Sequence, residues 1–515
     1  MPTRRWPTRA VADAGLARGD VADIVANVRL TGGGRTDPFG DDLVDVHLRA
    51  GRIVDIAPAG ALPVRGRVVD GDGGWLVPGL WDHHVHTVQW ALVAQRRLLD
   101  DATSYAHAAR IMTDAPILSD GRRVGTGFRD ALWTDEPTLA ILDAETGEVP
   151  TYLINADVHS VWLNSAALRR EGHEPDGVGI LREAPAFEIS RRLNAVPPEM
   201  ADRLVADAAD AAAARGVVGI VDLDMAWNEE AWARRLSTGF DALRIEFGIY
   251  PYHLERALAE GLQTGDPVRG VTSDLVHVGP LKVITDGSLG TRTAACSHAY
   301  PGDVHDHGVL TVPPDELVAL MTSAAGGGLA CAIHAIGDVA NSNALDAFAL
   351  SGAWGSIEHA QLVAHADIPR FARLGISASV QPEHAVDDRD VADALWAGQT
   401  AVPYPLRAFV DAGVPLLLGS DAPVAPLDPW AAMAAAVHRT RDGREPWHAE
   451  QAIDAATALA ASTHGGSGDG AATIEPGAVA DLVVCDRDPL TAGDAAMRGT
   501  AAVATLLGGR LTHRA

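Results

Sequence analysis

Cysteine is scarce in this sequence, and the few cysteines stand far apart. The 515 residues include three, Cys296, Cys331 and Cys485, and no two of them form a C-x-x-C pair. A disulfide framework and a thiolate zinc site both need clustered or paired cysteines, so both are excluded. This usage suits a reducing compartment, and we expect a cytoplasmic protein.

Positive charge and long apolar runs are also lacking. The chain has 41 Lys and Arg against 68 Asp and Glu, a formal net charge of −27, which argues against a nucleic-acid partner or an anionic membrane surface. No apolar run approaches the roughly 18–20 residues that span a bilayer, and the basic first residues lack the apolar segment of a signal peptide. Hydrophobic residues make up 47% of the chain, which excludes a disordered protein.

Both ends of the chain are rich in strand patterns. Residues 23–31 and 43–59 alternate β-branched and polar side chains around glycine-containing turns, and residues 477–486 and 501–514 do the same. These patterns predict a small β-sandwich built from both termini, residues 21–75 and 475–515, with one large central domain between them.

The central part alternates short apolar runs with alanine-rich helical stretches, which is typical of parallel β/α units. Eight strands are predicted, at residues 76–86, 216–224, 243–250, 275–285, 329–337, 355–360, 376–382 and 414–422. Eight is the number that a (β/α)₈ TIM barrel needs, so we predict a distorted barrel over residues 76–474. Residues 87–215, with weaker strand patterns, are assigned to a long insertion after the first barrel strand. A doubly wound open sheet is the alternative fold.

Polar residues stand at the ends of these predicted strands. His84 and His86 end the first strand, and because alternate side chains of a strand share a face, both can grip one ion. The fourth, fifth, sixth and eighth strands carry Lys282, His334, His359 and Asp421. In a barrel, the carboxyl ends of the strands converge on one mouth.

Each of these residues alone has a plain structural explanation. A lone histidine on an apolar strand is more often a core or surface residue than a ligand. Lys282 is unusual in an apolar strand, but an ion pair with Asp286 or a side chain that reaches solvent would explain it. Asp421 suits a helix N-cap or a turn. It is the ordered series, spread over five separate strands, that favours a metal site.

Several segments of the sequence carry a resemblance to a known family: PGLWDHHVH, VGPLKVITDGSLGTRTAA, IHAIGDVAN, SIEHAQLV and LLGSDAPVAPLDPW. They resemble the amidohydrolase superfamily, specifically its YtcJ-like branch, to which N-substituted formamide deformylases belong. TYLINADVHSVWLNSAAL, in the insertion, also resembles this branch. IEPGAVADLVVCDRDP looks like the stretch that returns such chains to their β-sandwich. The match runs from about residue 23 to the end.

The resemblance implies a ligand set for one or two divalent metal ions. His84, His86 and Asp421 would bind the more buried ion, and His334 and His359 a second one. Lys282 would bridge the two ions as a carbamate, formed when its neutral amine reacts with CO₂. Burial and a nearby cation both favour the neutral amine. Zinc is the default ion for these ligands, with Mn²⁺ or Fe²⁺ as alternatives.

The expected activity is hydrolysis of a C–N bond in a small, non-peptide, amide-like or formamide-like molecule. A metal supplies hydroxide at neutral pH and polarises the carbonyl, and Asp421 acts as the general base, passing the proton to the leaving nitrogen. Ester hydrolysis, deamination, decarboxylation and isomerisation are alternatives on the same fold. A non-catalytic binding protein is the alternative from another class.

Substrate contacts are assigned to His159, Arg292 and Asp286. Each residue has an equally good structural explanation. His159 could form a structural hydrogen bond, Arg292 a surface salt bridge, and Asp286 an ion pair with Arg292. Gln381 and His384 follow the seventh strand and are expected near the same mouth, and the role of His83 is open. We expect the insertion to cover the opening. The expected partner is a small-molecule substrate, with no nucleic acid and no membrane. The resemblance suggests that the protein forms a homodimer.

Overall fold

The computed structural model describes most of the chain as two compact units. The described residues are 16–31, 39–63, 65–118, 120–128, 130, 133–155, 160–182, 184–463 and 472–515. One unit combines residues 1–87 with 209–515, and the other comprises Val88–Ala208. Within the described residues, no helix combines the length and the apolar character needed to cross a membrane.

The first unit contains a sheet of eight parallel strands. The strands, in chain order and in sheet order, are β6 (Leu80–Val85), β12 (Val217–Asp222), β13 (Arg244–Ile249), β14 (Val276–Ile284), β15 (Cys331–Ala335), β16 (Gly355–His359), β18 (Ser377–Val380) and β20 (Leu416–Leu418). A bridge between Val85 and Ala422 joins the two ends of this sheet. The predicted distorted (β/α)₈ barrel is confirmed, and the open-sheet alternative is wrong.

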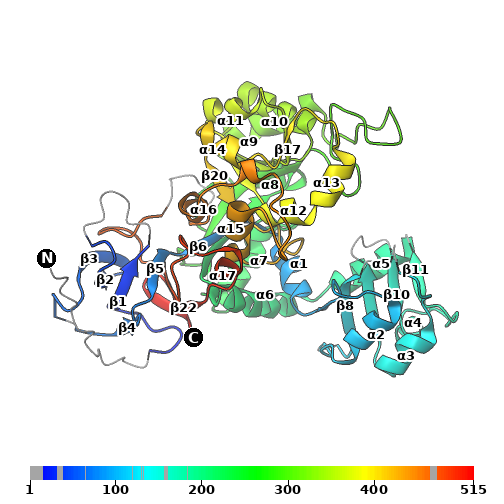
Figure 1. The fold of residues 1–515 in the computed structure, drawn as a ribbon, viewed down its shortest axis with the longest axis horizontal. Coiled ribbons are helices and arrows are strands. Elements are labelled where there is room, and N and C mark those ends of the chain that lie inside the picture. Colours follow the sequence, from blue (N-terminus) through cyan, green and yellow to red (C-terminus); the bar gives the residue numbers. More distant parts are fainter. Residues whose placement is uncertain are drawn as a thin grey trace. The chain divides into compact units, whose positions relative to one another are not determined.

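Helices between the strands cover the barrel, as Figure 1 shows in green to orange. They are α7 (Asn228–Ser237), α8 (Pro251–Ala259), α9 (Pro314–Gly326), α10 (Asp338–Ser351), α11 (Ile368–Leu374), α12 (Pro382–Asp387), α13 (Arg389–Leu395), α14 (Leu406–Asp411), α15 (Pro429–His438) and α16 (Ala455–Ala461). Helix α6 (Pro198–Ala213) begins in the second unit and ends in the first. Helix α10 is representative. Ala340, Ala344 and Phe348 recur every fourth residue and are buried, which is the spacing of one helix face.

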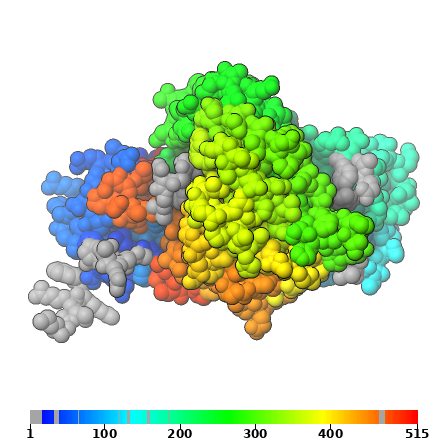
Figure 2. Space-filling model, turned by 90° about the horizontal axis from the view of Figure 1, so that it is seen from above, coloured from blue at the N-terminus to red at the C-terminus, as the bar shows by residue number. Residues whose placement is uncertain are grey.

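The two chain ends together form a β-rich domain in the same unit. Its strands are β1 (Ile24–Leu30), β2 (Val44–Arg49), β3 (Arg52–Pro58), β4 (Val68–Asp70), β5 (Trp75–Pro78), β21 (Leu482–Cys485), β22 (Ala502–Leu507) and β23 (Arg510–Arg514). Strand β21 pairs with β5 and with β22, so segments from opposite termini are neighbours. Figure 2 shows the blue and orange segments lying against each other.

Residues 76–86 were expected to form one strand, and the structure divides them. Residues up to Pro78 belong to β5 of the β-rich domain, and β6 of the barrel begins at Leu80. Gly79 lies at the junction, where a Cβ atom would stand 2.4 Å from the Val218 side chain. The close approach to β12 therefore requires glycine at the point where the chain passes from one sheet to the other.

The second unit has a five-stranded sheet of its own. The sheet order is β11 (Ile180–Arg182), β10 (Ser160–Leu163), β9 (Thr151–Asn155), β8 (Arg123–Phe128) and β7 (Arg97–Leu98). Helices α2 (Tyr105–Thr113), α3 (Leu139–Thr146), α4 (Ser165–Arg170) and α5 (Ala184–Asn194) belong to it, and α1 (Thr87–Val93) begins at its boundary. The buried Trp162 and Tyr152 anchor its core, so the insertion is a folded body.

Candidate metal centre

The structure brings the six predicted ligands together at one end of the barrel. His84 lies in β6, Lys282 in β14, His334 in β15 and His359 at the end of β16. The remaining two, His86 and Asp421, follow β6 and β20 directly. All six come from the carboxyl ends of parallel strands, and this shared end explains how positions so distant in sequence can meet.

One half of the cluster is formed by the first and last strands. The Nε2 atoms of His84 and His86 lie 3.5 and 3.3 Å from Oδ1 of Asp421. One ligand atom each from His84, His359 and Asp421 lie within 4.8 Å of one another. Imidazole nitrogens and a carboxylate oxygen at this spacing are a donor set for a divalent ion.

The other half lies beside it. The ring centroids of His334 and His359 are 4.4 Å apart, and those of His84 and His359 are 4.8 Å apart. Lys282 Nζ lies 3.5 Å from His84 Nε2, so the lysine stands among the imidazoles. Lys282 is 1% exposed, and it is the only lysine in the sequence.

The protonation states of these residues suit a cation. Burial, together with the charge of Lys282, holds the pKa of His84 well below its usual value and lowers that of His334 to about 3, so both rings are neutral and carry a free lone pair. Burial also lowers the pKa of Lys282. For Asp421 burial opposes ionisation, but His84, His86 and His384 outweigh it and the pKa is lowered.

Two ring nitrogens in the cluster have no protein partner. Nδ1 of His86 and Nδ1 of His359 are buried and form no hydrogen bond within the described residues. His359 and Asp421 also adopt left-handed backbone conformations, with φ of 73° and 58°. Such conformations are uncommon for non-glycine residues and concentrate at functional sites. The residues present therefore fit a divalent ion.

Glu358 orients the first histidine. Nδ1 of His84 lies 2.7 Å from Oε2 of Glu358, and because a carboxylate only accepts, Nδ1 is the donor. Nε2 of His84 is therefore the nitrogen that carries no proton, and its lone pair faces Asp421. Glu358 was not among the site residues predicted from the sequence. The available indication was a glutamate in the buried strand before His359, since glutamate is rarely buried without a partner.

Backbone contacts between β6 and β20 fix the first and last ligands relative to each other. Oδ1 of Asp82 accepts hydrogen bonds from the backbone N–H of Ser420 (2.9 Å) and of His84 (3.2 Å). The Asp421 N–H donates to the His84 carbonyl at 2.8 Å. Burial raises the pKa of Asp82 to about 6. His83 lies on the opposite face of β6, with Nδ1 donating to the Leu418 carbonyl at 2.8 Å.

The predicted substrate residues lie in different surroundings. Asp286 is buried and accepts hydrogen bonds from the backbone N–H groups of Ala295, Ile336 and Gly337, while burial raises its pKa to about 7. Its Oδ1 lies 3.4 Å from His334 Nε2. Arg292 is exposed and forms no ion pair within the described residues, so the Asp286–Arg292 pair is absent.

His159 lies outside the described residues. Gln381 and His384 lie near the cluster, as their position after the seventh strand predicted. Nε2 of His384 is 3.9 Å from Oδ2 of Asp421, and its ring stacks on that of His359 with centroids 6.1 Å apart. This Nε2 is buried and forms no hydrogen bond within the described part of the chain.

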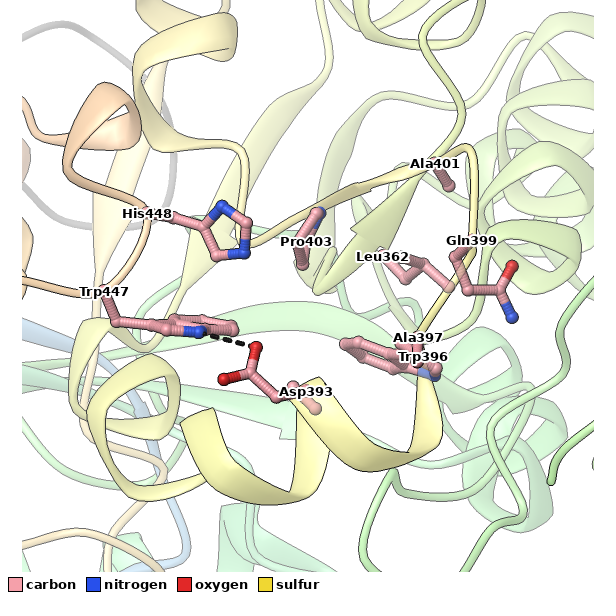
Figure 3. A pocket seen from close by; sticks show the side chains of 10 residues that line it. Leu362, Asp393, Trp396, Ala397, Gln399, Ala401, Pro403, Trp447 and His448 are labelled. Atoms are coloured by element: carbon pink, nitrogen blue, oxygen red, sulfur yellow. Dashed lines mark hydrogen bonds between the residues drawn. The ribbon is translucent and has the colours of Figure 1, made fainter.

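An aromatic cluster supports the segment that follows His384. Trp447 Nε1 donates to Oδ1 of Asp393 at 2.9 Å. Both tryptophans, Trp396 and Trp447, line a pocket of about 170 Å³, and Figure 3 shows them on opposite sides of it. The Tyr404 hydroxyl donates to Asp388, at 2.9 Å. These contacts join the chain after β18 to more distant loops, and so hold helix α12, which carries His384, in place.

A family model described as the amidohydrolase family matches residues 67–513. The chain belongs to the amidohydrolase family. The predicted resemblance is confirmed, and this amidohydrolase is accordingly a hydrolase that acts on carbon–nitrogen bonds.

Three relatives match most of this amidohydrolase. Protein LONG AFTER FAR-RED 3 of Arabidopsis thaliana is 28% identical, with 90% of this chain and 88% of the relative covered. Putative amidohydrolase YtcJ of Bacillus subtilis is 25% identical, with 86% and 89% covered. N-substituted formamide deformylase of Arthrobacter pascens is 26% identical, with 73% and 76% covered.

A solved structure shares the fold of this amidohydrolase. It is an uncharacterized metal-dependent hydrolase from Pyrococcus horikoshii, with a TM-score of 0.74 and 24% identity, covering 92% of this chain and 99% of that one. The likeness over almost the whole of both chains agrees with the barrel and the β-rich domain described above.

Proposed function

We propose that this amidohydrolase cleaves the C–N bond of a small, non-peptide amide or N-substituted formamide with the help of one or two divalent ions. The observation that carries the proposal is the convergence of His84, His86, Lys282, His334, His359 and Asp421 from five strands. The name of the Arthrobacter relative, an N-substituted formamide deformylase, supports the substrate class. Bound divalent ions supply the Lewis acidity that activates water and polarises a carbonyl oxygen.

Each protein group then has a defined task. His84, His86 and Asp421 hold one ion, and His334 and His359 hold a second, with zinc as the expected metal. The Lys282 amine attacks CO₂, forming an N–C bond and releasing a proton, and the resulting carbamate is an anionic ligand with two oxygens. A buried amine with a lowered pKa is the form that this reaction needs.

Asp421 is the proposed general base. Its pKa is lowered, so the carboxylate is ionised at neutral pH and accepts the proton of the attacking water, then returns it to the leaving nitrogen. The His384 Nε2, 3.9 Å from Oδ2 of this carboxylate, is placed to donate to a substrate oxygen. Arg292 and His159 remain candidates for orienting the rest of the substrate.

The test is Asp421→Asn, assayed on a panel of N-substituted formamides, amides, cyclic amides and esters. We expect wild-type turnover of at least one amide or formamide, and a loss of about 10²–10⁴-fold in the variant. His83→Asn is the matched control, since His83 is buried beside the ligands but faces away. Activity of Asp421→Asn within tenfold of wild type would refute the base, and turnover of esters alone would refute the substrate class.

A further inference from the structure

The unit formed by Val88–Ala208 contains an apolar cavity of about 180 Å³. Aliphatic side chains make up most of its wall, including Leu92, Val124, Leu193 and Leu204. All of its lining residues belong to this unit, and none is a residue of the metal centre. A mainly aliphatic wall with few polar groups is typical of a small-molecule site.

The cavity also contains an arginine without an acidic partner. Nη2 of Arg96 donates to Oδ1 of Asn194 at 2.6 Å and to the Leu193 carbonyl at 3.5 Å, and no carboxylate pairs with it within the described residues. Arg122, also in the wall, pairs with Asp120. Burial and the charge of Arg122 lower the pKa of Arg96 to about 10, so it stays a cation at neutral pH.

We propose that this cavity binds a small aliphatic carboxylate, with the carboxylate on Arg96 and the alkyl chain against the aliphatic wall. A guanidinium matches the two oxygens of a carboxylate with parallel N–H donors. Because one cation lacks a partner here, a single negative charge balances the site. At roughly 30 Å³ for each water-sized group, 180 Å³ accommodates about six such groups, which fits a chain close to hexanoate in length.

The charge of the rest of the chain makes this site unusual. Acidic residues outnumber basic ones by 27, so a general attraction for anions is absent. Asp120 is also contacted by Arg170, at 3.9 Å, so one carboxylate faces Arg122 and Arg170 while Arg96 has none. This local excess of cations beside an apolar wall distinguishes a carboxylate with an alkyl chain from a neutral hydrophobic molecule.

The experiment is calorimetric titration of the full-length protein with hexanoate, hexan-1-ol and acetate. We expect saturable, one-to-one binding of hexanoate, at least about tenfold weaker binding of hexan-1-ol, which lacks the charge, and of acetate, which lacks the chain. Arg96→Gln weakens hexanoate binding about tenfold or more. The matched control is Arg97→Gln, because Arg97 is the exposed neighbour, and it leaves the affinity unchanged.

A second variant tests the cavity independently of the charge. Val196 lines the cavity and is only partly buried, so Val196→Phe fills the space without disturbing the core of the unit, and we expect it to abolish binding while the melting curve stays cooperative. Bound hexanoate should also raise the melting temperature of wild type. Equal binding of hexanoate and hexan-1-ol, equal affinities of the Arg96 and Arg97 variants, or unaltered binding by a folded Val196→Phe would each overturn the proposal.

Discussion

Glu358 decides which nitrogen of His84 faces Asp421. Its carboxylate accepts the Nδ1–H at 2.7 Å, and the Ser356 hydroxyl donates to its other oxygen. Metal-binding histidines commonly use such a partner to fix the tautomer and to raise the basicity of the coordinating nitrogen. Glu358 touches no substrate in this account, so it is a positioning residue.

Removing the Glu358 carboxylate should lower the affinity for metal while the protein still folds. For Glu358→Ala we expect a loss of about 10–100-fold in metal affinity, measured by competition with a chromogenic chelator. Glu229→Ala is the control, because Glu229 is a buried glutamate that pairs with Arg269 at 3.0 Å in a different part of the barrel unit. An unchanged metal affinity in a folded Glu358→Ala variant would contradict the positioning role.

The single lysine permits a direct test of the carbamate. Lys282 is the only lysine in the sequence, so a side-chain carbamate can form at one position alone. We expect ¹³C NMR of the metal-loaded protein in ¹³C-bicarbonate to show a carbamate resonance that Lys282→Met lacks. Comparison with this variant separates the side chain from the terminal amine. Identical spectra for the two proteins would show that the lysine is unmodified.

Most of the candidate site could be predicted from sequence, because its ligands stand in short motifs at the ends of predicted strands. Glu358 could not be assigned a partner in this way, since His84 lies 274 positions away in sequence. The same limit applies to Asp286, whose three backbone donors come from other loops. Pairings of this kind follow from tertiary packing rather than from any local pattern.

At the level of elements, the first and last barrel strands, β6 and β20, must pack closely for their metal-binding residues to meet. Gly419 follows β20, and a Cβ atom there would stand 2.8 Å from the His84 backbone nitrogen and 3.1 Å from Oδ1 of Asp82. Both are closer than an ordinary van der Waals contact. The absence of a side chain therefore allows Asp421 to come within reach of His84 and His86.

Adding one methyl group at this position should destabilise the fold. For Gly419→Ala we expect a loss of about 1–3 kcal/mol in the free energy of unfolding, because an overpacked backbone must shift, measured by chemical denaturation. Gly290→Ala is the control, since its Cβ would meet nothing within 4 Å. A stability of Gly419→Ala equal to that of the control would show that the strands can separate freely.

The eight barrel strands could be predicted because parallel, fully buried strands appear as short apolar runs between helical patterns. The division of residues 76–86 could not, because apolar character continues through Gly79 from Trp75–Pro78 to Leu80 and Trp81. The close approach of Gly79 to Val218 at the junction is a contact between residues that are far apart in sequence.

For the whole molecule, a bound metal ion should stabilise the folded state, because it joins residues from the ends of several strands. Because an ion that binds only the folded state raises its stability, we expect a chelator to lower the melting temperature and abolish activity, and added Zn²⁺ to restore both. The control is His86→Asn, whose melting temperature should respond less to the chelator. Equal melting temperatures of the chelated and the Zn²⁺-loaded wild type would contradict a structural contribution of the ion.

The central claim is that residues between positions 84 and 421 meet around bound cations. The most direct measurement is a crystal structure of the metal-loaded protein, with anomalous scattering collected at the absorption edge of zinc. We predict an anomalous peak within bonding distance of His84, His86 and Asp421, with added density on Lys282 directed toward it. A structure that lacks any anomalous peak among these side chains, or that turns Lys282 or Asp421 away from the imidazoles, would contradict it.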